Sequence, residues 1–235
     1  MERSAVALIP ARLGSTRFPG KVLASETGRP LIWHVAKQAA RASIVKRVVI
    51  ATDSERVASV MRSFDIEAIL TGEHPNGTSR LAEAADGLRL AGGEIVVNVQ
   101  GDEPEIDPGA IEAAVESLAR TGADVGTVAS GFAPDEDPRD PNIVKAVVGR
   151  SGLALYFSRA LIPFDRDGEG KGGASPVGPL KHVGIYAYSA AFLRTYAKLS
   201  ETPLEGIEKL EQLRVLEHGY RIGVAVHDCR HHGID

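Results

Sequence analysis

The sequence contains little that could tie the chain together covalently or hold it in a membrane. Its 235 residues include one cysteine, Cys229, which excludes an internal disulfide and fits a reducing compartment. No apolar run approaches the roughly 20 residues of a membrane-spanning helix. The apolar run near the N-terminus is too short for a signal peptide. We therefore expect a cytoplasmic protein with no membrane partner.

An excess of positive charge is also missing. The formal net charge is −4 at pH 7, which gives no support to a nucleic-acid partner. The sequence shows no internal repeat, no low-complexity tract and no clear linker between domains. It therefore predicts one domain over residues 1–235, with an inserted or appended hairpin lobe at about residues 143–200.

Two familiar phosphate-binding motifs are absent. The P-loop pattern G-x-x-x-x-G-K-[ST] does not fit, because Gly14 and Gly20 stand one residue too far apart and Val22 replaces the metal-binding hydroxyl. The dinucleotide fingerprint G-x-G-x-x-G is not present either. A nucleotide bound by this chain would need another kind of loop.

Such a loop follows the first apolar run. Residues 5–9 predict a strand buried on both faces, which should end at Pro10 because proline cannot donate to a sheet ladder. The next stretch contains two glycines, two hydroxyls and three cations: Gly14, Gly20, Ser15, Thr16, Arg12, Arg17 and Lys21. Glycines let backbone amides approach a ligand, and the cations supply opposite charge, so a polyphosphate would fit. An ordinary solvated surface loop is the alternative.

The first half of the chain alternates strands with helices. Strands are expected at residues 47–52, 66–71, 94–99 and 125–129, and helices begin near residues 30, 54, 78 and 107. This alternation predicts an α/β fold with a mostly parallel sheet and helices on both faces. Ligands of such sheets lie beyond the carboxyl ends of the strands. The loop after residues 5–9 should therefore share one site with Asp102, which follows residues 94–99 and could hold magnesium.

The second half differs in character. A hairpin is expected from residues 143–148 and 153–158, joined by a turn at residues 149–152. Residues 165–179 are rich in glycine and predict a mobile loop. A strand at residues 181–188, helices at 190–199 and 203–218, and a strand at 222–226 follow. The buried face of the second helix is expected to carry Leu204, Ile207, Leu210 and Leu213.

The opening pattern I-P-A-R-L-x-S-T-R-x-P-G-K resembles the signature of sugar-acid cytidylyltransferases, in particular the 3-deoxy-manno-octulosonate (Kdo) cytidylyltransferase family. Further segments resemble the same family in the same order: V-N-V-Q-G-D-E-P, A-L-Y-F-S-R-A-x-I-P, K-H-V-G-I-Y-A-Y and L-E-x-I-E-K-L-E-Q-L-R-V-L-E-H-G. The resemblance implies a Rossmann-like nucleotidyltransferase fold of the GT-A-like kind, with a β-hairpin dimerisation lobe. It also implies magnesium, a homodimer, and formation of CMP-Kdo and pyrophosphate from CTP and Kdo for lipopolysaccharide biosynthesis.

The resemblance also assigns roles to residues. It implies that the triphosphate is held by Arg12, Ser15, Arg17 and Lys21, and that magnesium is held by Asp102 and Asp235. Cytidine contacts are implied for Arg80 and Gln100, and sugar contacts for Arg159, His182, Tyr186, Glu211 and Gln212. Without the resemblance, we would expect His182 to be a satisfied strand histidine and Glu211 a helix-surface acid, and the alternative for Asp102 is a turn-forming residue. Glu103 is expected to be structural.

The C-terminal end departs from the family. Family members carry the second magnesium ligand in G-V-D-T-P-E-D-L, before a last helix, whereas this chain ends in H-D-C-R-H-H-G-I-D. Asp235 matches that ligand, and the chain is either truncated or a divergent member. Two alternatives stay open at this point. The substrate could be another sugar acid, such as a sialic acid or 8-amino-Kdo, or the chain could be a non-catalytic nucleotide-binding relative.

Overall fold

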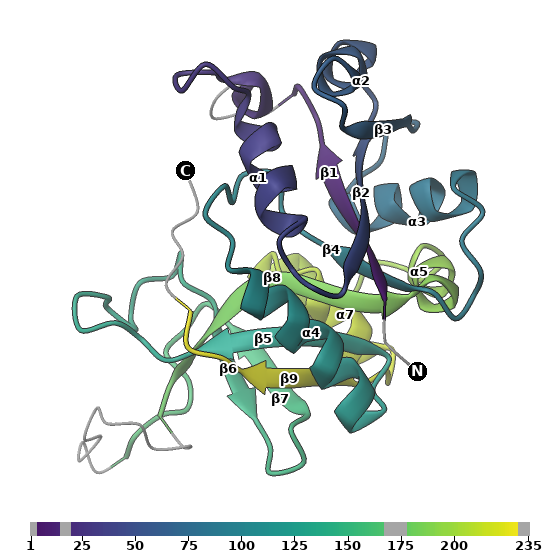
Figure 1. Cartoon of the computed structure of the whole chain (residues 1–235). Coiled ribbons are helices and arrows are strands. Elements are labelled where there is room, and N and C mark those ends of the chain that lie inside the picture. The colour runs from purple at the N-terminus through teal and green to yellow at the C-terminus, as the bar shows by residue number, and fades with distance from the viewer. Residues whose placement is uncertain (1–3, 15–19, 167–177, 230–235) are drawn as a thin grey trace.

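The strands of the protein join into one sheet. The structure is a computed structural model that describes residues 4–14, 20–166 and 178–229. Within these residues the strands are β1 (Ala5–Ala11), β2 (Val45–Thr52), β3 (Glu67–Leu70), β4 (Ile95–Asn98), β5 (Val125–Ser130), β6 (Lys145–Val148), β7 (Ala154–Ser158), β8 (Leu180–Ser189) and β9 (Ile222–Val226). Their order is β3-β2-β1-β4-β8-β5-β9, and the β6–β7 hairpin is attached to β8 (Figure 1).

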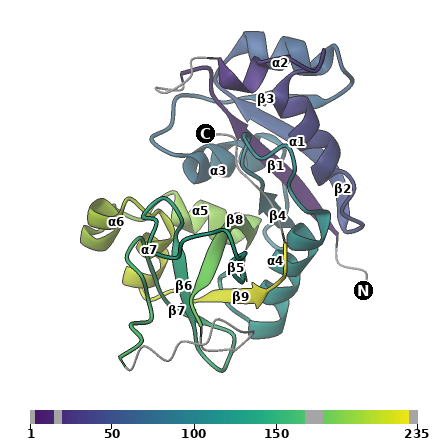
Figure 2. The ribbon, with the colours of Figure 1, turned by 90° about the vertical axis from the view of Figure 1, so that its left-hand side faces the viewer.

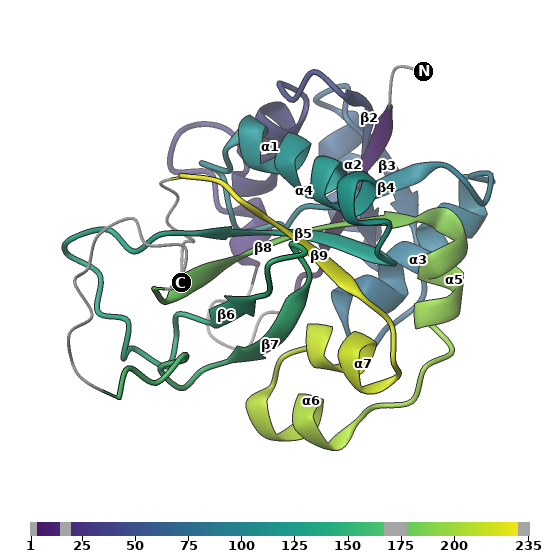
Figure 3. The same cartoon turned by 90° about the horizontal axis from the view of Figure 1, so that it is seen from below.

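Helices cover both faces of this sheet, as the sequence predicts. They are α1 (Leu31–Ala39), α2 (Glu55–Arg62), α3 (Gly77–Gly87), α4 (Pro108–Thr121), α5 (Ala190–Tyr196), α6 (Pro203–Glu208) and α7 (Gln212–Glu217), with a short 3-10 helix η1 (Lys21–Leu23). Figure 3 shows α1, α2 and α4 on one side and α3, α5 and α7 on the other. Alternate residues of β1 point to opposite faces of the sheet and belong to two separate hydrophobic cores. Ile9 shares one core with Ile32 and Ile111. Leu8 shares the other with Leu81 and Leu213.

The sheet is mostly parallel, but β5 is not the neighbour of β4. The antiparallel strand β8 lies between them and pairs with both, whereas β3, β2, β1 and β4 are parallel neighbours. The expected succession of parallel strands therefore holds as far as β4. Because Asn98 pairs with Tyr186, the carboxyl end of β4 lies beside the second half of β8. This arrangement brings residues from both halves of the chain together at the carboxyl end of β4.

Strand β1 runs two residues further than expected. Pro10 and Ala11 continue the ladder with β2, although a stop at Pro10 was predicted. On the other side, β4 pairs with β1 only as far as Leu8, so the missing N–H of Pro10 costs no ladder bond there. A β-carbon at Gly101 would lie 2.8 Å from the Pro10 carbonyl oxygen. Glycine at this position therefore allows the loop after β4 to touch the end of β1.

The predicted helix over residues 203–218 is wrong, because the structure contains two helices there. Lys209 has a φ of 55° and ends α6, and α7 begins at Gln212. As a result, Leu204 and Ile207 are 37% and 78% exposed, whereas Leu210 and Leu213 are buried as expected. A buried ion pair between Glu205 and Arg214 joins the two helices, with N–O distances of 2.6 and 2.7 Å.

Smaller predictions are partly confirmed. The hairpin forms, and Ser54 caps α2 by accepting from the Val57 amide. Helix α3 is capped by Asn76 instead of Thr78 or Ser79, and it ends at Gly87. Figure 2 shows β6, β7, α6 and α7 together, at the end of the molecule opposite α2 and β3. The predicted mobile loop lies mostly outside the described residues. In the described part of the chain, no helix has the length and apolar character needed to cross a membrane.

Candidate active site

A cavity of about 400 Å³ lies beside the carboxyl end of β4. Its walls come from the first turn of α3, the end of β4, strand β8, and the junction of α6 with α7. The five residues expected on the sugar side all line it, together with Gln100: Arg159, His182, Tyr186, Glu211 and Gln212. These residues come from elements up to 112 positions apart in sequence, so the fold itself gathers them.

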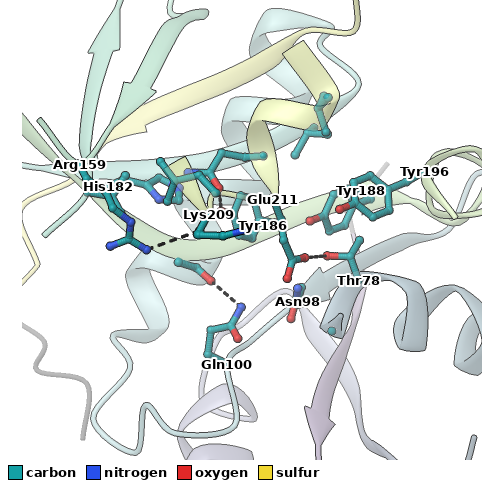
Figure 4. A pocket seen from close by; sticks show the side chains of 17 residues that line it. Thr78, Asn98, Gln100, Arg159, His182, Tyr186, Tyr188, Tyr196, Lys209 and Glu211 are labelled. Atoms are coloured by element: carbon teal, nitrogen blue, oxygen red, sulfur yellow. Dashed lines mark hydrogen bonds between the residues drawn. The ribbon is translucent and has the colours of Figure 1, made fainter. Parts of the chain in front are cut away.

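One end of the cavity carries nitrogen-containing side chains. Figure 4 shows Arg159, His182 and Lys209 on the same side of the cavity. Backbone carbonyls of Glu208 and Pro141 accept hydrogen bonds from the Arg159 guanidinium at 2.8 and 2.9 Å, which fixes its position. His182 Nε2 lies 2.9 Å from the hydroxyl of Thr127. This end is suited to a carboxylate.

The opposite end carries Glu211. Its carboxylate accepts a hydrogen bond from the Thr78 hydroxyl at 3.1 Å and is open to the solvent of the cavity. Surrounding protein atoms raise the pKa of Glu211, mainly by desolvation, while Thr78 and the positive charge of Arg12 act in the other direction. The Tyr186 hydroxyl donates a hydrogen bond to the side-chain amide oxygen of Gln212 at 3.2 Å, and this bond orients the amide. Glu211 and Gln212 can therefore bind hydroxyl groups.

Lys21 and Asp102 meet in the loop that follows Gln100 of the cavity wall. Lys21 Nζ lies 3.3 Å from Asp102 Oδ2, and their side chains are 14% and 50% exposed. The two residues are 81 positions apart, and the close approach at Gly101 brings their loops together. Two of the predicted catalytic residues are therefore neighbours, one from each loop.

The surroundings of Asp102 suit a magnesium ion. Its carboxylate is half exposed and offers the oxygen ligands that magnesium prefers. The described residues contain no group of three acidic, histidine or cysteine side chains around it. An ion at Asp102 would therefore take its other ligands from water, from phosphate oxygens or from Asp235.

Three predicted site residues lie outside the described part of the chain: Ser15, Arg17 and Asp235. Their roles stay predictions. Arg12 is described and exposed, and its positive charge acts on Glu211.

Arg80 is placed differently from expectation. Its guanidinium donates to Asp53 at 2.6 Å and to the Thr71 hydroxyl at 2.7 Å, and the residue is buried. It is not among the residues that line the cavity, whereas Thr78, two positions earlier, is. The structure therefore gives Arg80 protein partners, and its role as a nucleotide contact stays a prediction.

Several cavity residues were missed in the sequence. Asn98, Tyr188, Tyr196 and Lys209 also line the cavity. Alternation along a strand could have found two of them, because Asn98 stands two positions before Gln100 and Tyr188 two positions after Tyr186. No local pattern marks Tyr196 or Lys209.

Glu103 has a partly buried carboxyl group. Its Oε2 atom is buried and has no hydrogen-bond partner among the described residues. Burial, followed by the charge of Asp102, raises the pKa of Glu103 to about 7.

Replacing Glu103 with glutamine should change how stability depends on pH. In the wild type, the folded state keeps a proton on Glu103 that the unfolded chain loses above its normal pKa of 4.5. Stability should therefore fall as pH rises from about 4.5 to about 7, by at most about 3 kcal/mol, since one pKa unit corresponds to 1.36 kcal/mol. Glu103→Gln should remove this loss in urea unfolding of metal-free protein. The exposed control Glu105→Gln should keep the loss of stability with rising pH. If plots of unfolding free energy against pH were parallel for wild type and Glu103→Gln, the raised pKa of Glu103 would be contradicted.

Comparisons with known proteins agree with this geometry. The family model for cytidylyltransferases matches residues 6–222. The chain belongs to the cytidylyltransferase family. It is 49% identical over 232 residues to a 3-deoxy-manno-octulosonate cytidylyltransferase of Syntrophobacter fumaroxidans, with 98% of this chain and 91% of the relative covered. A relative of the same description from Anaeromyxobacter dehalogenans is 51% identical, with 99% and 93% covered.

Solved structures give the same result. The chain superposes on a CMP:2-keto-3-deoxy-manno-octonic acid synthetase complexed with CTP, with a TM-score of 0.89, 38% identity, and 99% and 93% of the two chains covered. A 4-diphosphocytidyl-2C-methyl-D-erythritol synthase, with a TM-score of 0.64 and 14% identity, shares the fold. The relatives place this chain in the Kdo branch of the cytidylyltransferases, and it is a nucleotidyltransferase.

Proposed function

We propose that this cytidylyltransferase transfers CMP from CTP to 3-deoxy-manno-octulosonate and releases pyrophosphate, a step that supplies activated Kdo for lipopolysaccharide. One observation carries the proposal. The five residues expected on the sugar side line a single cavity together with Gln100, and Asp102, which contacts Lys21, follows Gln100 by two residues. A sugar acid in the cavity would lie beside a nucleotide whose phosphates contact Lys21.

The reaction joins the anomeric hydroxyl of the sugar acid to the α-phosphorus of CTP. The hydroxyl oxygen attacks in line, the bond from the α-phosphorus to the bridging oxygen breaks, and pyrophosphate leaves with the electron pair. Such a transfer depends mainly on positioning and on neutralisation of charge. Lys21 and Arg12 would neutralise the triphosphate and the departing pyrophosphate, together with Ser15 and Arg17 of the same loop.

Magnesium is the cofactor we propose. Asp102 would hold it, with Asp235 as the proposed second protein ligand. When bound, magnesium neutralises phosphate charge and lowers the pKa of a coordinated hydroxyl. The half-exposed carboxylate of Asp102 supports this proposal, because it offers oxygen ligands of the kind that magnesium prefers.

Pyrophosphate release with different nucleotides tests the proposed function. Gln100 lines the cavity, and its side-chain nitrogen lies 3.4 Å from the Gly184 carbonyl oxygen, so its amide can reach a base held at the end of β4. A site that pairs the cytosine edge rejects bases that leave its polar groups unpaired. With Kdo present, CTP should be preferred to ATP and GTP by orders of magnitude, and UTP should be the nearest competitor. Equal turnover with a purine triphosphate would overturn the proposal.

Glu211→Ala should weaken the use of Kdo and leave CTP binding nearly unchanged. Loss of a hydrogen bond to a charged group costs about 1.5–3 kcal/mol, which corresponds to a roughly 10- to 150-fold rise in the KM for Kdo. Steady-state kinetics and calorimetry with CTP measure the two effects separately. Glu116→Ala on the exposed side of α4 is a control that should change neither. An equal loss of CTP affinity would show that the site is not divided in this way.

We also propose a homodimer that uses the hairpin and α6. Among the described residues, seven large apolar side chains are exposed, and five of them lie between residues 155 and 207: Leu155, Leu161, Phe164, Leu204 and Ile207. The pattern that predicted burial of Leu204 and Ile207 would be satisfied by a second copy of the chain. Sedimentation of Ile207→Lys beside wild type tests this, and a dimer of unchanged affinity would exclude α6 from the interface. Location in the cytoplasm, where CTP is available, stays a prediction.

A further inference from the structure

Two polar atoms at the cavity lack partners. The carbonyl oxygen of the Asn98 side chain and the hydroxyl of Tyr196 are buried and form no hydrogen bond within the described part of the chain. Both residues line the cavity, and each is 2% exposed. Figure 4 shows both on the side of Glu211, away from Arg159.

The two side chains are held by well-defined surroundings. Asn98 is the last residue of β4, and its backbone pairs with Tyr186 of β8. The ring of Tyr196 lies 5.1 Å from the guanidinium of Arg214, which is itself fixed by two hydrogen bonds to Glu205. Neither side chain is on a loose loop, so their polar atoms stay at the cavity wall.

Two hydroxyls lie near these atoms, Tyr188 beside Asn98 and Thr78 beside Tyr196. Neither forms a hydrogen bond with them, and Thr78 donates its proton to Glu211 at 3.1 Å. A buried donor or acceptor without a partner destabilises a folded protein, and native structures contain few of them. Such atoms at the wall of a ligand cavity indicate that the partner comes with the ligand.

We propose that Asn98 and Tyr196 are specificity-determining residues that bind hydroxyl groups of the sugar acid. The substrate then lies with its carboxylate toward Arg159 and with hydroxyls of its carbon chain toward Asn98, Tyr196 and Glu211. This inference rests on the proposed function. A hydroxyl can donate to the Asn98 oxygen and can accept from the Tyr196 phenol, whereas a methylene group can do neither. A second carboxylate at this end would meet the negative charge of Glu211.

Tyr196→Phe separates a role in binding from a role in folding. The variant loses an unsatisfied hydroxyl, so the substrate-free protein should melt at the same temperature as wild type or higher. Its kcat/KM for Kdo should fall about 10-fold or more, with the KM for CTP within about twofold of wild type. Tyr220→Phe, outside the cavity, is the matched control and should change neither quantity. Asn98→Leu, which has a similar volume, should show the same pattern as Tyr196→Phe.

Single-deoxy analogues of Kdo complete the test and require no folded variant. Wild type should use at least one of them about 10-fold less well than Kdo, and Tyr196→Phe or Asn98→Leu should lose most of that discrimination. A lower melting temperature of Tyr196→Phe with unchanged sugar kinetics would overturn the inference, because the hydroxyl would then bind protein or a buried water. So would equal use of every analogue by wild type. If wild type releases no pyrophosphate from CTP and Kdo, the proposed function fails and the inference fails with it.

Discussion

Replacement of Lys21 by alanine is expected to lower kcat about 100-fold or more, with little effect on folding. The ammonium group lies beside Asp102, where the triphosphate and its magnesium would meet. Removal of a charge that stabilises the transition state costs roughly 2.7 kcal/mol or more, which corresponds to a factor of about 100 in rate. The ion pair with the half-exposed Asp102 contributes at most about 1 kcal/mol to stability.

Steady-state kinetics and thermal unfolding of Lys21→Ala test this expectation together. Lys46→Ala is a suitable control, because Lys46 is exposed and its amine makes one long contact, 3.4 Å to the Ser43 carbonyl oxygen. The control should match wild type in both measurements. Unchanged turnover of Lys21→Ala would show that the loop after β1 does not hold the triphosphate. A large fall in melting temperature would mean that the residue acts on folding.

Asp102→Asn is expected to have an effect of similar or larger size, about 100- to 1,000-fold in turnover. The substitution keeps the shape of the side chain but removes the charge of the carboxylate that we propose as a magnesium ligand. The concentration of magnesium needed for half-maximal activity should rise as well. Asp235→Asn should change both quantities in the same direction and by less, because Asp102 is held in the turn four residues after β4, where Gly101 touches the end of β1.

A magnesium titration of activity distinguishes the two carboxylates, and manganese binding in the presence of CTP gives an independent readout. Asp102→Asn should bind manganese more weakly than wild type, with Asp235→Asn in between. If Asp102→Asn titrates like wild type in both measurements, magnesium is held elsewhere. If Asp235→Asn matches wild type throughout, the tail has no part in the metal site.

Elements with a strong local pattern could be predicted from the sequence. Strands such as β2 and helices such as α2 and α4 have clear apolar periodicity and caps, so their positions are close to expectation. The insertion of β8 between β4 and β5 could not be predicted in this way, because strand pairing across some 85 residues leaves no local pattern. The break at Lys209 was missed because a residue other than glycine adopts the left-handed conformation there.

In the site, too, residues in recognisable motifs could be predicted, and residues whose role depends on long-range contacts could not. Motif resemblance identified five residues that the fold then brings into one cavity. It did not identify Asn98 or Tyr196, because their significance depends on burial and on the absence of partners, and neither property can be read from a segment. For Arg80 the resemblance implied a nucleotide contact, and the structure adds a partner that no local pattern indicates, since Asp53, 27 residues away, pairs with its guanidinium.

The most direct test of the account is phosphorus NMR of the purified protein with CTP, Kdo and magnesium. We expect the three resonances of CTP to be replaced by those of pyrophosphate and of one new phosphodiester, CMP-Kdo, in equal amounts. A sialic acid or 8-amino-Kdo in place of Kdo should give the products much more slowly. An unchanged CTP spectrum with Kdo, or faster conversion of another sugar acid, would contradict the central claim that this enzyme activates Kdo.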